Sequence, residues 1–145
     1  MAEKIPQNLA NHSRLDPPFH FFILPVFAIS LIIAIVHLAR HPGLHSAWLV
    51  VFMLAAITLA FKMRIYALRV QDRIIRLEER LRLAILLDKP LRARIGELSE
   101  MQLVALRFAS DAELPALTAK TLSEKLSNAD IKKAVVQWRP DYWRV

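Results

Sequence analysis

Residues 19–61 read FHFFILPVFAISLIIAIVHLARHPGLHSAWLVVFMLAAITLAF, and Arg40 is the only Asp, Glu, Lys or Arg residue among them. Arg40 separates two charge-free runs, 19–39 and 41–61, each 21 residues long. A bilayer core about 30 Å thick needs roughly 20 helical residues, and Pro42 with Gly43 breaks the helix between the runs. The stretch therefore predicts a transmembrane hairpin with spans at about 19–39 and 46–64 and a loop at 40–45.

Two other interpretations of these runs are weaker. A chain of 145 residues has little material with which to cover two core helices that are apolar on every face. The first run is also longer than a signal-peptide core, and no basic leader or small-residue cleavage site accompanies it. We therefore expect an all-α membrane protein whose two apolar helices cross a lipid bilayer.

The positive charge is concentrated after the second run. Of the net charge of +7, residues 62–94 supply most, with ten basic and four acidic residues. The loop between the spans holds a single formal positive charge, Arg40, whereas four basic residues lie within about 15 residues of the second span. The positive-inside rule then predicts that both termini are cytoplasmic.

The second span is expected to continue beyond the bilayer as a basic amphipathic helix over residues 62–88, because no proline or glycine occurs from Ala47 to Lys89. Four arginines fall on one side of this helix: Arg69, Arg73, Arg76 and Arg80. This arginine face either contacts anionic lipid or an acidic partner, or is a solvated surface that obeys the positive-inside rule.

An apolar seam runs along the same helix at alternating steps of three and four residues, the spacing of a short coiled coil. Its members are Ala67, Val70, Ile74, Leu77, Leu81 and Ala84. A weaker apolar stripe lies elsewhere on the helix, at Leu68, Ile75 and Leu86. The seam is expected to form a homodimer or to pack against the chain's own C-terminal helices.

Residues 89–145 predict a small cytoplasmic lobe of three to four short helices. Asp88 and Pro90 end the long helix. Ser99 and Ser127 are predicted N-caps, and Pro115 is expected in a first turn. The helices are expected over about 99–109, from the Pro115 turn to 126, and over 128–138, around a core of Leu103, Leu106, Phe108, Leu117, Leu122, Ile131, Val135 and Trp138.

The two ends of the chain are candidate contact surfaces. The polar N-terminal segment, residues 1–18, contains QNLANH, with Gln7, Asn8, Asn11 and His12. These residues suit helix capping, head-group contact or docking on the lobe. The final WRPDYWRV has a composition typical of interfaces and bilayer boundaries. The candidate contact residues there are Arg139, Tyr142, Trp143 and Arg144. We expect both ends to form one surface with the arginine face, with ordinary packing of the chain end as the alternative.

Three spaced blocks, QNLANH, ALRFASDAELP and IKKAVVQWRPDYWRV, together resemble an uncharacterised bacterial family of short two-span membrane proteins with a domain of unknown function. The likeness covers essentially the whole chain. It implies a bacterial membrane protein. The expected location is the inner (cytoplasmic) membrane. The likeness brings no activity, cofactor or catalytic residue.

The histidines are the best candidates for chemistry. His37, His41 and His45 are spaced by four residues, which suits two metal ligands on one helix face. Pro42 and Gly43 interrupt that helix, however, and no acidic residue nearby would orient an imidazole. Interfacial histidines are the favoured interpretation, and a histidine-dependent metal or haem site at the hairpin is the alternative.

Other chemistry is not indicated. The chain has no cysteine, no Ser-His-Asp pattern, no phosphate-binding loop and no nucleic-acid-binding signature. We expect no catalytic residue, cofactor or nucleic acid partner. The sequence thus predicts a non-enzymatic, membrane-anchored helical interaction protein or structural accessory subunit. Its expected partners are the lipid bilayer and either an unknown protein or a second copy of itself.

Overall fold

The computed structural model describes residues 6–11 and 15–141, and the regular structure in these ranges is entirely helical. The predicted all-helical class is therefore confirmed. The described residues divide into two units, one formed by residues 15–69 and the other by residues 6–11 together with 70–141. They are called the hairpin unit and the lobe unit below.

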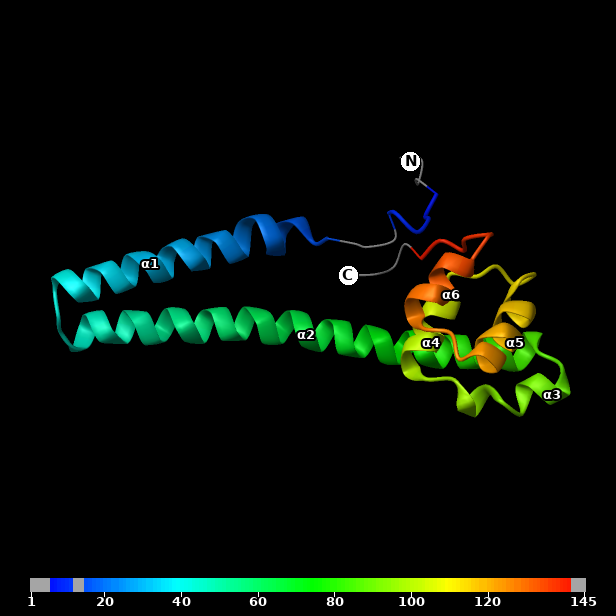
Figure 1. The fold of residues 1–145 in the computed structure, drawn as a ribbon. Helices are drawn as coiled ribbons and strands as arrows, with labels where there is room; N and C mark the ends of the chain where they lie inside the picture. The colour runs from blue at the N-terminus through cyan, green and yellow to red at the C-terminus, as the bar shows by residue number, and fades with distance from the viewer. Residues whose placement is uncertain (1–5, 12–14, 142–145) are drawn as a thin grey trace. The chain divides into compact units, whose positions relative to one another are not determined.

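The hairpin unit begins with a π-helical turn, Phe19–Ile23, which leads into α1, Leu24–Arg40. The chain then reverses direction through residues 41–43 and enters α2, Leu44–Leu86 (Figure 1). Pro25 lies in the first turn of α1 and has no N–H to donate to the carbonyl of Phe21. The wider π-helical turn occurs where this bond is missing.

Side-chain contacts close both ends of the hairpin unit. At the reversal, Ser46 Oγ donates a hydrogen bond of 2.7 Å to the carbonyl of His41. At the other end, Arg64 Nη1 lies 3.0 Å from Asp16 Oδ2, which joins the segment before α1 to α2. The two helical arms are therefore tied together by polar contacts at their ends.

The apolar surface of the hairpin unit is largely exposed. The helices Phe19–Arg40 and Leu44–Leu86 are long and apolar enough to cross a membrane, and only 6% of the most apolar window of each is buried. Ile33 and Leu59 remain 62% and 61% exposed. A core helix of a water-soluble protein would have most of such surface covered.

The lobe unit places four short α-helices against the C-terminal part of α2 (Figure 1). They are α3, Lys89–Arg92; α4, Glu100–Leu106; α5, Leu114–Glu124; and α6, Asn128–Ala134, with a 3₁₀ turn at Ile95–Glu97. The predicted caps form. Ser99 and Gln102 make a reciprocal capping box, Ser127 Oγ accepts from Asp130 N at 3.2 Å, and Pro115 lies in the first turn of α5.

Two helices of the lobe are shorter than expected. α4 ends at Leu106 instead of about 109, and α6 ends at Ala134 instead of Trp138. Both ends are used in one extended pairing, an antiparallel bridge between Ala109 and Trp138. Arg139 N donates to the carbonyl of Phe108 at 2.7 Å. Backbone groups that would have continued the helices bond to each other instead.

The core of the lobe unit agrees with most of the prediction. Six of the eight expected residues are buried, and Leu122 and Trp138 are partly buried against them. The prediction missed six buried members of the same cluster: Leu83 of α2, Leu87 directly after it, Leu98, Ala105, Ala109 and Leu114. The C-terminal part of α2 is thus a wall of the lobe core.

Candidate functional site

Opposite sides of α2 have different surroundings in the lobe unit. A row at four-residue spacing, Ile75, Glu79, Leu83 and Leu87, is buried. Spacing by four residues forms the ridge with which helices commonly pack against one another. The predicted seam lies on the other side, and its members Val70, Ile74, Leu77 and Leu81 are 58%, 51%, 60% and 59% exposed. The expectation that the seam packs against the chain's own C-terminal helices is therefore wrong.

The arginine face is divided between solvent and the fold. Arg69, Arg73 and Arg80 are exposed. Arg76 is not free for a ligand, because its guanidinium pairs with Glu100 and its Nε donates to the carbonyl of Asp72 at 3.1 Å. The four arginines thus do not present one uniform basic surface.

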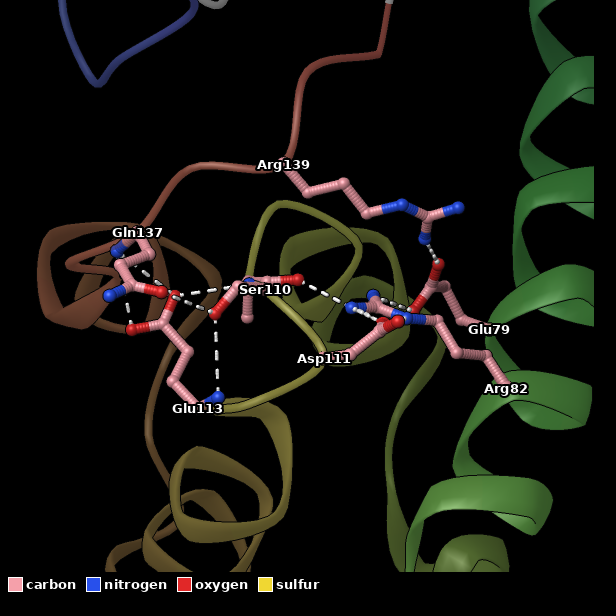
Figure 2. Close-up of polar contacts among 8 residues, drawn as sticks. Glu79, Arg82, Ser110, Asp111, Glu113, Gln137 and Arg139 are labelled. Atoms are coloured by element: carbon pink, nitrogen blue, oxygen red, sulfur yellow. Dashed lines mark hydrogen bonds and ion pairs between the residues drawn. The ribbon is translucent and has the colours of Figure 1, made fainter.

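A network of buried charge joins α2 to the loop before α5 (Figure 2). Arg82 Nη1 donates to Glu79 Oε2 at 3.1 Å, and its Nη2 donates to the carbonyl of Ala109 at 2.6 Å. Its Nε donates to Asp111 Oδ1 at 2.7 Å. Arg139 Nη1 reaches the other carboxylate oxygen, Glu79 Oε1, at 3.2 Å. The Glu79 side chain is 3% exposed, so two arginines neutralise a carboxylate inside the fold.

The electrostatics of Glu79 result from opposing effects. Burial raises the pKa of Glu79 above its ordinary value of 4.5, because the charged form loses its water. The guanidinium groups of Arg82 and Arg139 act in the other direction, and Arg82 has the larger effect. The nearby charge of Glu78 adds a small upward contribution. Burial dominates, so the carboxyl is harder to ionise than an exposed one.

A second carboxylate, Glu113, clamps the backbone after α6 (Figure 2). Its oxygens accept from Val136 N at 3.1 Å and from Gln137 N at 3.2 Å. It also accepts from Ser110 N at 3.2 Å, while Ser110 Oγ accepts from Glu113 N at 3.4 Å. Asp111 and Glu113 both precede α5, which begins at Leu114. These carboxylates serve the fold.

The N-terminal block contacts the C-terminal segment. Gln7 Nε2 donates to the carbonyl of Asp141 at 3.1 Å, and Asp141 N donates to Gln7 Oε1 at 2.7 Å. Asn8 and Asn11 form a local turn in which Asn8 Oδ1 accepts from Asn11 N at 3.1 Å. Gln7 is thus one of the predicted contact residues that meets the lobe, and His12 lies outside the described residues.

Of the four predicted residues at the C-terminal end, the structure places only Arg139. Its side chain is 52% exposed and pairs with Glu79 rather than joining the arginine face. Tyr142, Trp143 and Arg144 lie outside the described residues. The expected single surface of both ends with the arginine face therefore stays a prediction.

The histidines lie at the turn of the hairpin unit. The rings of His37 and His41 have centroids 5.2 Å apart, and His45 lies in the first turn of α2. All three are exposed. Among residues 6–11 and 15–141, no group of three or more His, Cys, Asp or Glu side chains is placed to hold a metal ion.

The open end of the hairpin unit gathers a charged pair and aromatic rings. Arg64 Cζ lies 5.7 Å from the centroid of the Phe19 ring, which meets Phe61 edge-on at 6.0 Å. Arg64 also pairs with Asp16, and His20 Nδ1 lies 2.8 Å from the Asp16 carbonyl. Sequence reasoning missed this cluster because Asp16 and Arg64 are far apart in sequence. The available signal was that Asp16 precedes the first apolar run and Arg64 follows the second. A hairpin brings these two opposite charges to the same end.

Comparison with curated proteins and with solved structures found no similar protein. A family model described as a family of unknown function, DUF6526, matches residues 1–145. This match confirms the expected membership of a family of unknown function over the whole chain. The chain therefore belongs to this family of unknown function, DUF6526.

Proposed function

We propose that this chain is a non-enzymatic, membrane-anchored helical module that presents a small cytoplasmic lobe and one face of α2 for interaction. Residues 19–61 form its anchor in the bacterial inner membrane. The same role describes a structural accessory subunit of a larger membrane complex.

The exposed apolar surface of the hairpin unit carries the proposal. Both helices have the length to cross a bilayer, and only 6% of the most apolar part of each helix is buried. Charge-free helical surface of this extent is unfavourable in water and favourable in lipid. Arg40 stands alone at the turn, whereas Lys62, Arg64 and Arg69 follow the second apolar run. The positive-inside rule then supports both termini on the cytoplasmic side.

The way the lobe uses its polar residues supports an interaction role. Arg82 bonds to Glu79 and to the Ala109 carbonyl, which holds the lobe on α2. Glu113 accepts from the backbone after α6, so its charge serves the fold of the lobe. At the same time the lobe leaves the apolar seam of α2 exposed. An exposed apolar stripe of this kind is typical of a surface that binds another protein.

Two measurements on bacterial cells that express the full chain test this proposal. Alkaline extraction of isolated membranes should leave the chain in the membrane pellet. A photo-reactive residue at Leu77, on the uncovered face, should give a protein adduct, while the same group at Lys120, exposed on α5, should not. Release of the chain by alkali would contradict the anchor. A lack of any protein adduct at Leu77 would contradict the interaction role.

A histidine-dependent metal or haem site is the second candidate, and the proximity of the His37 and His41 rings favours it. Metal analysis and an absorption spectrum of the detergent-purified chain separate the two candidates. We expect neither a stoichiometric metal nor a haem spectrum. One metal ion or haem per chain, lost on His37→Ala substitution, would establish the second candidate in place of the first.

A further inference from the structure

The seam exposed on α2 has the detailed pattern of a two-stranded coiled coil. Within the lobe unit, Val70, Leu77 and Ala84 occupy d positions of a heptad, and Ile74 and Leu81 occupy a positions. The centre of the seam is Ile74 at a followed by Leu77 at d. A β-branched residue at a with leucine at d favours parallel dimers over larger bundles.

The lobe leaves this seam accessible. Taking 100° per residue, the seam lies about 160° around α2 from the buried row of Ile75, Glu79, Leu83 and Leu87. The lobe therefore packs on one side of the helix, and the seam points away from it. Four seam residues and Ile85, which is 78% exposed, are available to a partner.

The charges beside the seam indicate which partner fits it. Arg73 is at a g position, and Glu78 is at the e position of the next heptad. In a parallel, in-register pair of helices, g of one helix lies beside the following e of the other. Arg73 of each copy would then meet Glu78 of the other, giving two ion pairs related by a two-fold axis. Both side chains are exposed, and neither has an ion-pair partner in the part of the chain described here.

An antiparallel arrangement fits less well, because it brings g positions together and would face Arg73 or Arg80 with another arginine. Arg80, at the second g position, meets Ile85 at e in the parallel arrangement. There its aliphatic stem covers apolar surface while its guanidinium stays in water. The flanking residues therefore favour a parallel pair of identical helices.

We propose that the chain self-associates as a parallel homodimer through the α2 seam, Val70, Ile74, Leu77, Leu81 and Ala84, with reciprocal Arg73–Glu78 ion pairs. This inference rests on the proposed membrane anchor, which gives two copies the same orientation. Confinement of both copies to one membrane raises their effective concentration, so a seam of two to three heptads suffices.

Cysteine crosslinking tests the interface, since the natural chain has no cysteine. Leu77→Cys places a thiol at a central d position, and Asp72→Cys, also exposed, places one on the opposite side of the helix. On oxidation in native membranes, Leu77→Cys should give a species of twice 16.6 kDa that contains two differently tagged copies. Asp72→Cys should stay monomeric. Equal crosslinking of both variants, or none at Leu77, would overturn the seam.

Charge exchange tests the parallel register. In the Leu77→Cys background, Arg73→Glu alone and Glu78→Arg alone should each lower the dimer yield by about fivefold, because like charges then face each other. Coexpression of the two variants should restore a mixed dimer, in which both pairs are complementary again. If the yield of the mixed dimer is no higher than the yields of the two single-variant dimers, the ion pairs are contradicted.

These experiments separate the inference from the function on which it depends. A chain that resists alkaline extraction and forms a Leu77 adduct only with a different protein would disprove self-association and leave the interaction role standing. A chain that alkali releases from the membrane would remove both.

Discussion

Glu79 and Arg82 show how buried charge holds the lobe to α2. The Glu79 side chain is 3% exposed and the Arg82 side chain 11%, and three separate segments meet at this pair: α2, the loop at Ala109–Asp111 and Arg139. Removal of one partner of a buried pair leaves an uncompensated charge, which costs more than the pair itself contributes.

Arg82→Ala should therefore lower the free energy of unfolding of the lobe by about 3 kcal/mol at neutral pH. The substitution also removes hydrogen bonds to Asp111 and to the Ala109 carbonyl. The measurement is urea unfolding of the full chain in detergent, followed by the fluorescence of Trp138, which packs 5.0 Å from Phe108. Trp48 and Trp143 are replaced by phenylalanine in all samples.

Two controls accompany Arg82→Ala. Lys120→Ala, at an exposed site on α5, should change the free energy of unfolding by less than about 0.5 kcal/mol. Adding Glu79→Gln to Arg82→Ala should recover part of the loss, because no buried charge is then left alone. If Arg82→Ala and Lys120→Ala have equal effects, the network does not stabilise the lobe.

The raised pKa of Glu79 predicts a pH dependence of stability. Between the ordinary value of 4.5 and the raised folded pKa, the folded chain holds a proton that the unfolded chain releases. Stability in this window falls as pH rises. The free energy of unfolding of the wild type relative to Glu79→Gln should therefore decrease from pH 4.5 upward and level off above the folded pKa. An increase with pH would mean that the arginines outweigh burial and lower the pKa.

Among the elements, α4 depends on its N-terminal cap. Ser99 Oγ accepts from Gln102 N at 3.3 Å, Ser99 N donates to Gln102 Oε1 at 2.8 Å, and Gln102 Nε2 reaches the Leu126 carbonyl at 2.9 Å. The cap thus fixes the start of α4 and also joins it to the segment that follows α5.

Ser99→Ala should lower the free energy of unfolding of the lobe by about 1 kcal/mol, because a backbone N–H of the first turn loses its acceptor. The matched control is Ser123→Ala on α5, where the hydroxyl donates only to the Lys120 carbonyl at 3.1 Å. The same urea titration measures both variants. If Ser123→Ala lowers the free energy of unfolding as much as Ser99→Ala does, the N-terminal cap makes no specific contribution to the stability of the lobe.

Local signals explain which elements could be predicted from the sequence. The apolar runs, the break at Pro42 and Gly43, and the serine caps act over a few residues. The caps place the starts of α4 and α6, and α2 begins at Leu44, two residues before the predicted start at 46. The early ends of α4 and α6 could not be predicted, because they depend on a bridge between Ala109 and Trp138, residues far apart in sequence.

The face of α2 that packs on the lobe could not be predicted from the sequence either. Glu79 lies in the middle of the buried row and makes that row look polar, whereas the seam is apolar throughout. The two arginines that pair with Glu79 offset the cost of burying its carboxylate. One of them, Arg139, is 60 residues away in the sequence. The contact of Gln7 with Asp141 likewise has no local signal.

At the scale of the whole molecule, the proposed function rests on two exposed apolar surfaces, whose contact with water is unfavourable. The hairpin unit exposes apolar helices suited to lipid, and the lobe unit exposes an apolar seam suited to a second helix. The charges follow the same division, with few near the turn at 41–43 and many after residue 61. These features support the proposed anchor, in which the turn lies outside and the lobe lies in the cytoplasm.

The most direct test of this account is the side of the membrane on which two single cysteines lie. Gly43→Cys lies in the turn, where an added Cβ meets nothing within 4 Å, and Lys120→Cys lies exposed on α5. A membrane-impermeant maleimide applied to intact spheroplasts should label Gly43→Cys at once and Lys120→Cys only after the membrane is permeabilised. Labelling of both cysteines from the same side would contradict a hairpin that crosses the bilayer twice.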